Sequence, residues 1–231
     1  MNEIHNGIAE RWNREKGLIV RIPEKGFITI PKTEISLYPF DKVDKFGIPL
    51  EVKSLLRRNI VFLKKENGVF SRKAIMMEDF NNLYVGKIVE AKISSIANIG
   101  IFLRYKTLIM FCPISEISNS FVKTPDECFY KGQSINVKVL SKPDENRYVI
   151  VSYKATFNPD MFRFSIGDTL VCKVTNVNES IEAYFLEVTP AINGILNIND
   201  CPITLKYGDR IIGIVRKITS KGIKISFQQK I

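Results

Sequence analysis

Residues 84–105 read YVGKIVEAKISSIANIGIFLRY, and apolar side chains alternate with polar ones along two runs of this stretch. The runs are Ile88–Ile93 and Gly100–Tyr105. Alternation with a period of two is the pattern of a strand that turns one face to a core. The stretch therefore predicts two short strands, as in a small β-barrel or β-sandwich.

The same alternation recurs along most of the chain. Gly, Pro, Asn and Asp separate the runs, which include 135–140, 148–152, 169–174, 183–188 and 223–227. Helical periodicity is weak, and its best candidates are Glu3–Lys16 and a short piece around Leu50–Arg58. We expect an all-β protein with a short N-terminal helix.

Several short motifs occur more than once, in the same order. The pairs are YVGKIVEAKISSI (84–96) with SIGDTLVCKVTNV (165–177), IPKTEIS (30–36) with CPISEIS (112–118), FSRKA (70–74) with VSYKA (151–155), and KGQSINV (131–137) with YGDRIIG (207–213). Ordered repeats predict copies of one structural module. We expect three copies, at residues 1–79, 83–157 and 164–231, with the first abbreviated and the third divergent.

Charge and hydropathy narrow the class of protein. The 231 residues carry 34 basic and 24 acidic side chains, a net charge of +10, and every module has a basic excess. Such an excess suits a polyanionic partner, although a basic protein without one would look the same. No apolar run approaches the roughly 20 residues of a membrane span, and the first residues lack the pattern of a signal peptide. We expect a soluble cytoplasmic protein with no membrane anchor.

The residues of common metal sites and catalytic sites are missing. The four cysteines form no CxxC pair, and His5 is the only histidine. Structural zinc needs clustered Cys or His ligands, so we expect reduced thiols and no metal. The sequence contains no P-loop and no GxGxxG motif. We expect no cofactor and no enzymatic activity.

An ordered set of motifs runs through the middle copy. It consists of Gly86, Gly100-Ile101-Phe102-Leu103, Ile114-Ser115-Glu116-Ile117, Gly132, Val137-Lys138-Val139 and Val149-Ile150-Val151-Ser152. This set resembles the S1 RNA-binding domain, the OB-fold module of ribosomal protein S1. The resemblance implies tandem OB-fold, five-stranded barrels, which bind single strands on the face of their second and third strands.

Phe102 is the candidate stacking residue of the middle copy. If Ile101 and Leu103 face the barrel interior, Phe102 and Arg104 face outward together. An outward aromatic ring beside a cation suits stacking on a base and contact with a phosphate. The alternative is that Phe102 lies under a loop or against a neighbouring domain.

Four further residues of this copy are candidate nucleic-acid contacts. Lys92 and Lys138 fall on polar positions of strands, where they line the groove of Phe102 or belong to a solvated face. Tyr148 stacks on a base or caps the sheet, and Arg147 contacts a phosphate or only solvent.

The other copies depart further from the family. In the third copy Phe185 repeats the aromatic platform and Asn197 stands at the position of a family histidine. However, Glu182 and Glu187 flank Phe185 and would repel phosphate. In the first copy basic residues gather at 57–58, 64–65 and 72–73, either as a solvated face or as a contact with rRNA.

The resemblance implies a non-enzymatic protein that binds single-stranded or loop RNA, such as mRNA or rRNA. It also implies the ribosome as a further candidate partner, and a role in translation or mRNA handling. Two expected contacts are absent, because Ile99 and Pro113 replace an aromatic residue and a histidine of the family. We therefore expect weaker binding than that of a typical S1 domain. The alternatives are a module that docks on the ribosome or a polymerase, and a binder of single-stranded DNA.

Overall fold

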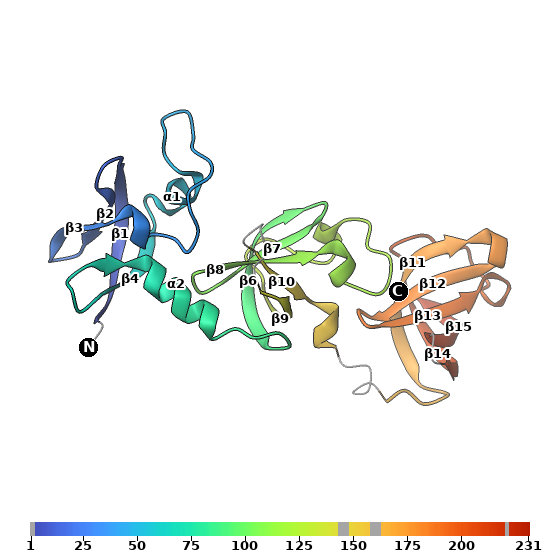
Figure 1. Cartoon of the computed structure of the whole chain (residues 1–231). Coiled ribbons are helices and arrows are strands. Elements are labelled where there is room, and N and C mark those ends of the chain that lie inside the picture. Colours follow the sequence, from blue (N-terminus) through green and yellow to red (C-terminus); the bar gives the residue numbers. More distant parts are fainter. Residues whose placement is uncertain (1–2, 143–147, 158–162, 220–221) are drawn as a thin grey trace. The chain divides into compact units, whose positions relative to one another are not determined.

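Figure 1 shows the computed structural model, which describes residues 3–142, 148–157, 163–219 and 222–231. Its contacts divide the chain into two compact units. The first unit comprises Met1–Leu83 and Lys106–Leu108, and the second comprises Tyr84–Tyr105 and Ile109–Ile231. Each unit is described by itself.

The first unit holds a curled, five-stranded sheet in the order β3-β2-β1-β4-β5. The strands are β1 (Glu3–Asn13), β2 (Gly17–Ile22), β3 (Gly26–Ile30), β4 (Asn59–Lys64) and β5 (Phe70–Ser71). Helix α1 (Leu50–Leu55) lies between β3 and β4 in the chain, inside one of the two predicted helical stretches. Residues of β1, β2, β3, β4 and α1 share one core around the fully buried Phe62. In this described part β3 and β5 form no ladder, so the barrel stays open.

The helix expected over Glu3–Lys16 is wrong, because most of this stretch forms β1, which pairs with β2 and β4. Three apolar residues recur at every fourth position, as they would in a helix: Ile4, Ile8 and Trp12. The buried positions of the strand are Gly7 and Ala9. Their small side chains give no apolar alternation, so the strand signal is hidden.

The helix α2 (Arg72–Asn81) follows β5 and was not expected from the sequence. It begins in the repeated motif FSRKA, where the Oγ of the buried Ser71 accepts a hydrogen bond from the backbone N–H of Ala74 at 3.0 Å. In the matching VSYKA, Ser152 Oγ accepts from the backbone N–H of Ala155 at the same distance. Both motifs therefore end a strand and cap a helical turn, and only the first turn continues as an α-helix.

The second unit begins with a closed barrel in the order β10-β8-β7-β6-β9. Its strands are β6 (Ile88–Ala97), β7 (Gly100–Tyr105), β8 (Leu108–Pro113), β9 (Ser134–Ser141) and β10 (Val149–Ser152). Alternate residues of each strand are buried, as the sequence predicts. Gly100 begins β7 with a φ of +149°, and a Cβ there would lie 2.2 Å from the carbonyl oxygen of Cys112. This hairpin therefore requires glycine.

A second closed barrel follows in the order β11-β12-β13-β15-β14. Its strands are β11 (Thr169–Asn178), β12 (Ala183–Thr189), β13 (Ile192–Asn197), β14 (Arg210–Thr219) and β15 (Gly222–Lys230). By position along the chain, this strand order is the same as in the middle barrel. The first unit has the same order too, with the closing pair missing.

The three sheets confirm the predicted fold class of tandem OB-like modules, with an open first copy. They also show the structural basis of the repeats. Gly86 and Gly167 both have positive φ, and their N–H groups donate to Val139 and Val215 at 2.8 and 2.9 Å. Among the residues that the structure describes, no helix is long and apolar enough to cross a membrane.

Candidate nucleic-acid interface

Three aromatic rings meet on the outer surface of the middle barrel. Phe102 lies on β7, Phe111 on β8, and Tyr148 directly before β10. The ring centroids of Phe102 and Phe111 are 4.8 Å apart, those of Phe102 and Tyr148 5.4 Å, and those of Phe111 and Tyr148 6.4 Å. All three rings are half-buried. We call these three residues the aromatic trio.

The alternation of the strands places the trio on the outside. Ile101 and Leu103, on either side of Phe102, are fully buried in the barrel. Met110 and Cys112 flank Phe111 in the same way, and both are fully buried. Each ring therefore points away from the core, and the contacts among the rings hold them in one surface patch.

Two cations lie beside the trio. Lys92 on β6 and Arg104 on β7 are direct partners across the antiparallel pair, and both side chains are exposed. Arg104 is two positions after Phe102 on the same strand, so the two share the outer face. The structure thus brings Lys92, Phe102, Arg104 and Tyr148 together, as the sequence suggests, and it adds Phe111.

Lys138 lies elsewhere on the barrel. It is the partner of Ile88 at the start of β6, whereas Phe102 is the partner of Ser95 near the end of that strand. On its other side Lys138 is the partner of Ser152 on β10, two residues after Ile150, which is the partner of Phe111. Lys138 is therefore two strands away from Phe111 and has no direct partner in the trio. Arg147 lies outside the described residues.

The third barrel has the same platform position but other neighbours. Phe185 on β12 is half-buried and faces outward between the buried Tyr184 and Leu186. The parallel pairs Phe111↔Ile150 and Ile195↔Lys224 make Ile195 the counterpart of Phe111. By the same pairing Gly222 corresponds to Tyr148, so Phe185 has neither aromatic neighbour of the trio.

The acidic residues next to Phe185 serve contacts within the protein. Glu187 accepts a hydrogen bond from the Oγ of Ser118, in the segment of the middle barrel that follows β8. Glu182 accepts from Asn199 Nδ2 at 2.8 Å. Asn197 Oδ1 accepts from the backbone N–H of Asn199 at 2.8 Å, which makes it the cap of a 3₁₀ turn.

Residues 118–127 of the middle barrel contact the third barrel, within the same compact unit. The backbone N–H of Asn119 donates to the carbonyl oxygen of Pro190 at 2.7 Å, and its side-chain amide donates to that of Ala191 at 2.9 Å. Tyr207 donates its hydroxyl to Glu127. Burial and this bond raise the pKa of Tyr207 to about 12, so the phenol stays protonated as the donor. The strand 2–3 face of the third barrel thus contacts protein.

The basic residues of the first unit are partly committed to the fold. Arg72 is buried and donates to the carbonyl oxygen of Ile35 at 2.9 Å. Lys65 pairs with Glu34 at 2.8 Å. Burial raises the pKa of Glu34, but hydrogen bonds from Lys65 and Ser71 and the nearby lysine charges outweigh it, so the pKa lies below its ordinary value. Arg72 and Lys65 are therefore not members of a solvated charge cluster.

Sequence reasoning missed Phe111, which stands in the apolar run Leu108–Pro113. The available signal was its alternation with Met110 and Cys112. Within the described ranges no group of three His, Cys, Asp or Glu residues is arranged to hold a metal ion.

Comparisons with known proteins find one matching family model and several distant relatives. Residues 83–154 match the model of the S1 RNA binding domain. The small ribosomal subunit protein bS1 homolog of Bacillus subtilis is 29% identical over 214 residues, covering 89% of this chain and 54% of that protein. The homolog of Bacillus cereus is 27% identical over 231 residues, covering 93% and 58%. The solution structure of GSP13 from Bacillus subtilis, 26% identical, covers 36% of this chain and 66% of that one with a TM-score of 0.32.

The fold and the family match define the class: residues 83–154 form an S1 RNA-binding domain, within a chain of repeated OB-fold modules. Over most of its length it is distantly similar to ribosomal protein bS1. The chain spans about half the length of the curated relatives that it matches.

Proposed function

We propose that this protein binds single-stranded or loop RNA through the middle barrel, without catalysis. The observation that carries the proposal is the aromatic trio on the β7–β8 face, beside the paired cations Lys92 and Arg104. Exposed rings stack on bases of any sequence, and each stacked base contributes roughly 1–3 kcal/mol. Binding then depends on shape, stacking and phosphate contacts more than on sequence.

We propose a wider role as well. The protein acts in the cytoplasm on mRNA or on rRNA, in translation or in mRNA handling. The segments 1–79, 83–157 and 164–231 are the proposed modules, with Lys92, Phe102, Arg104 and Tyr148 as RNA contacts of the middle one. Lys138, on β9 and two strands from Phe111, is a further proposed RNA contact.

A second candidate function is docking on a protein partner such as the ribosome or a polymerase. The contact of residues 118–127 with the third barrel favours it, because an OB face of this chain already contacts protein there. A third candidate is single-stranded DNA, since a stacking platform does not distinguish the sugars.

Fluorescence anisotropy with a labelled oligouridylate tests the proposal at two salt concentrations. We expect the wild type to bind, and binding to fall by about 5- to 150-fold in Phe102→Ala. Two phosphate contacts, from Lys92 and Arg104, predict a slope of log K against log salt of about −1.4. Phe27→Ala, at an exposed aromatic residue of β3 in the first unit, is the matched control.

Three results would decide against this function. Absence of binding at low salt excludes it, and co-sedimentation with ribosomes without affinity for free RNA supports docking. Preference for an oligodeoxyuridylate in direct competition supports single-stranded DNA.

A further inference from the structure

We propose that the contact between the middle and third barrels forms a second binding site, a pocket for one nucleobase of the same RNA strand. This inference rests on the proposed function and extends it. The pocket has a volume of about 170 Å³. Pockets for drug-sized ligands hold roughly 300–1,000 Å³, so this one suits a single flat ring system and not a whole nucleotide.

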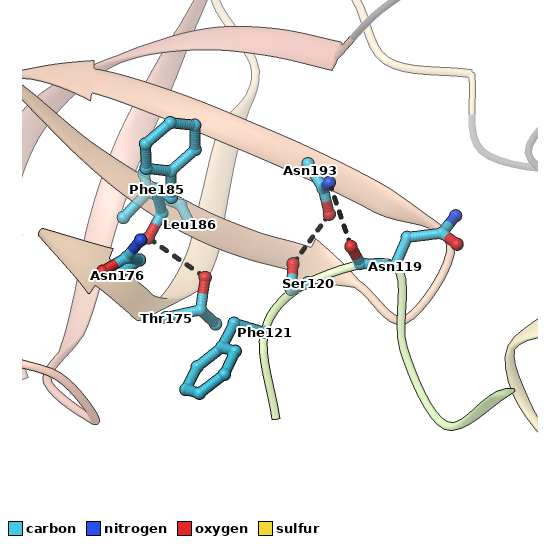
Figure 2. A pocket seen from close by; sticks show the side chains of 8 residues that line it. All are labelled: Asn119, Ser120, Phe121, Thr175, Asn176, Phe185, Leu186 and Asn193. Carbon is cyan, nitrogen blue, oxygen red and sulfur yellow. Dashed lines mark hydrogen bonds between the residues drawn. The ribbon is translucent and has the colours of Figure 1, made fainter. Parts of the chain in front are cut away.

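Both barrels build the pocket (Figure 2). Phe185, Asn176 and Asn193 come from the third barrel, while Ser120 and Phe121 come from the segment after β8 of the middle barrel. Ser120 Oγ donates to Asn193 Oδ1 at 2.7 Å, and Asn193 Nδ2 donates to the carbonyl oxygen of Asn119 at 3.4 Å. These bonds fix one wall against the other, so the pocket exists only while the barrels are docked.

The lining matches a base and not a phosphate. Every side chain that lines the pocket is uncharged, and two of them are the aromatic rings of Phe121 and Phe185. Asn176 Oδ1 accepts from the backbone N–H of Val177 at 2.9 Å, and among the described residues the structure records no partner for its amide nitrogen. An aromatic face beside side-chain amides is how proteins hold an unstacked base by its face and its edge.

Cations for the adjoining phosphates lie in the same row of side chains. Asn176 is the partner of Phe185, Phe185 of Ile195, Ile195 of Lys224, and Lys224 of Lys217. Strands lie about 4.8 Å apart, so Lys224 is about 10 Å along the row from Phe185.

The two lysines give an independent sign of an anionic partner. Lys217 and Lys224 are exposed and directly opposite each other on an antiparallel pair. Like charges at directly opposite positions are destabilising. In the described part of the chain neither of them forms an ion pair, so a bound phosphate would offset their repulsion.

The row also differs from its counterpart on the middle barrel. There the equivalent positions are Ser95, Phe102, Phe111 and Ile150, with aromatic neighbours and no lysine. The middle barrel thus stacks bases on an open platform. The third barrel holds one base between Phe185 and the loop of its neighbour, with phosphates toward Lys224 and Lys217.

The test uses the full chain and a short oligouridylate, followed by anisotropy. We expect Phe185→Ala and Phe121→Ala each to weaken binding by about 5- to 150-fold. Asn176→Ala, which removes a base-edge contact, should weaken it by about 2- to 10-fold. Asn136→Ala, an exposed asparagine of β9 outside the pocket, is the matched control and should bind as the wild type does.

A second readout locates the base directly. With 4-thiouridine in the RNA and ultraviolet irradiation, cross-linked peptides should include those of Phe121 and Phe185, besides that of Phe102. One set of results refutes this pocket while the proposed function stands. In it the wild type binds and Phe102→Ala weakens binding, but Phe185→Ala and Phe121→Ala do not weaken it and the cross-links stay on the trio. If the wild type itself does not bind RNA, both proposals are refuted.

Discussion

Replacement of Phe111 by alanine tests the aromatic trio at the residue that sequence reasoning did not find. Its ring centroid lies 4.8 Å from that of Phe102 and 6.4 Å from that of Tyr148. Each aromatic pair contributes about 0.5–1.5 kcal/mol beyond the apolar area that it buries, so loss of the two pairs should by itself cost the barrel about 1–3 kcal/mol of stability. A domain is typically stable by about 5–15 kcal/mol, and the variant should stay folded.

The RNA affinity of this variant should fall by a comparable amount. Loss of one stacking surface corresponds to about 1–3 kcal/mol, or 5- to 150-fold in Kd. Anisotropy at low salt measures Kd, while urea unfolding followed by circular dichroism measures stability. Phe111→Leu keeps the apolar bulk and removes the ring, so it should bind about as weakly as Phe111→Ala while unfolding nearer to the wild type. Affinity of Phe111→Ala within about twofold of the wild type would refute the stacking role of the trio.

Three further predictions concern stability and thiol chemistry. Gly100→Ala should lower the free energy of unfolding in urea by more than about 3 kcal/mol, because the new Cβ would lie 2.2 Å from a carbonyl oxygen. Gly86→Ala, which has open space around it, should lower it by about 1–2 kcal/mol. Equal losses would contradict this reasoning. Ser71→Ala removes the cap of α2 and should cost about 0.5–2 kcal/mol, and an unchanged urea midpoint would argue against the cap. Burial raises the pKa of Cys112 from 9.0 to about 12. The neutral thiol therefore contributes its full stability below pH 9.0, and this contribution is lost as the pH rises toward 12. At pH 8 a thiol reagent should label the exposed Cys128 in the native protein and Cys112 only after unfolding.

The sequence was most informative where burial alternates strictly. Phe102 could be placed on the outer face because Ile101 and Leu103 had to share the core. The paired glycines Gly86 and Gly167 could be matched because only glycine takes their backbone conformation without strain. These features depend on local geometry, which the sequence records directly.

Other features depend on partners far away in the chain. The strand β1 looked helical because its buried positions carry the small residues Gly7 and Ala9. At Gly7 a larger side chain has no room, because a Cβ would lie 2.6 Å from Val20 and 3.3 Å from Phe62. The open edge of the first sheet could not be predicted either, because it depends on whether β3 and β5 meet. The contact of Ser118 with Glu187 is of the same kind, since it joins residues from two barrels.

The three modules show how one scaffold supports different surfaces. Inward positions must fill a small barrel and are restricted to apolar side chains, whereas outward positions of the same strands have no such restriction. At the platform position the middle and third barrels keep Phe102 and Phe185, and the first unit has Ile19 two residues after the glycine that corresponds to Gly100. Because the neighbours of this position change from rings to lysine, the modules should differ in how they hold RNA while sharing one fold. Salt dependence can separate stacking from phosphate contact. Replacing both Lys217 and Lys224 by Ala should make the slope of log K against log salt less steep by about 1.4, whereas Phe185→Ala and Phe111→Ala should weaken binding with little change in that slope.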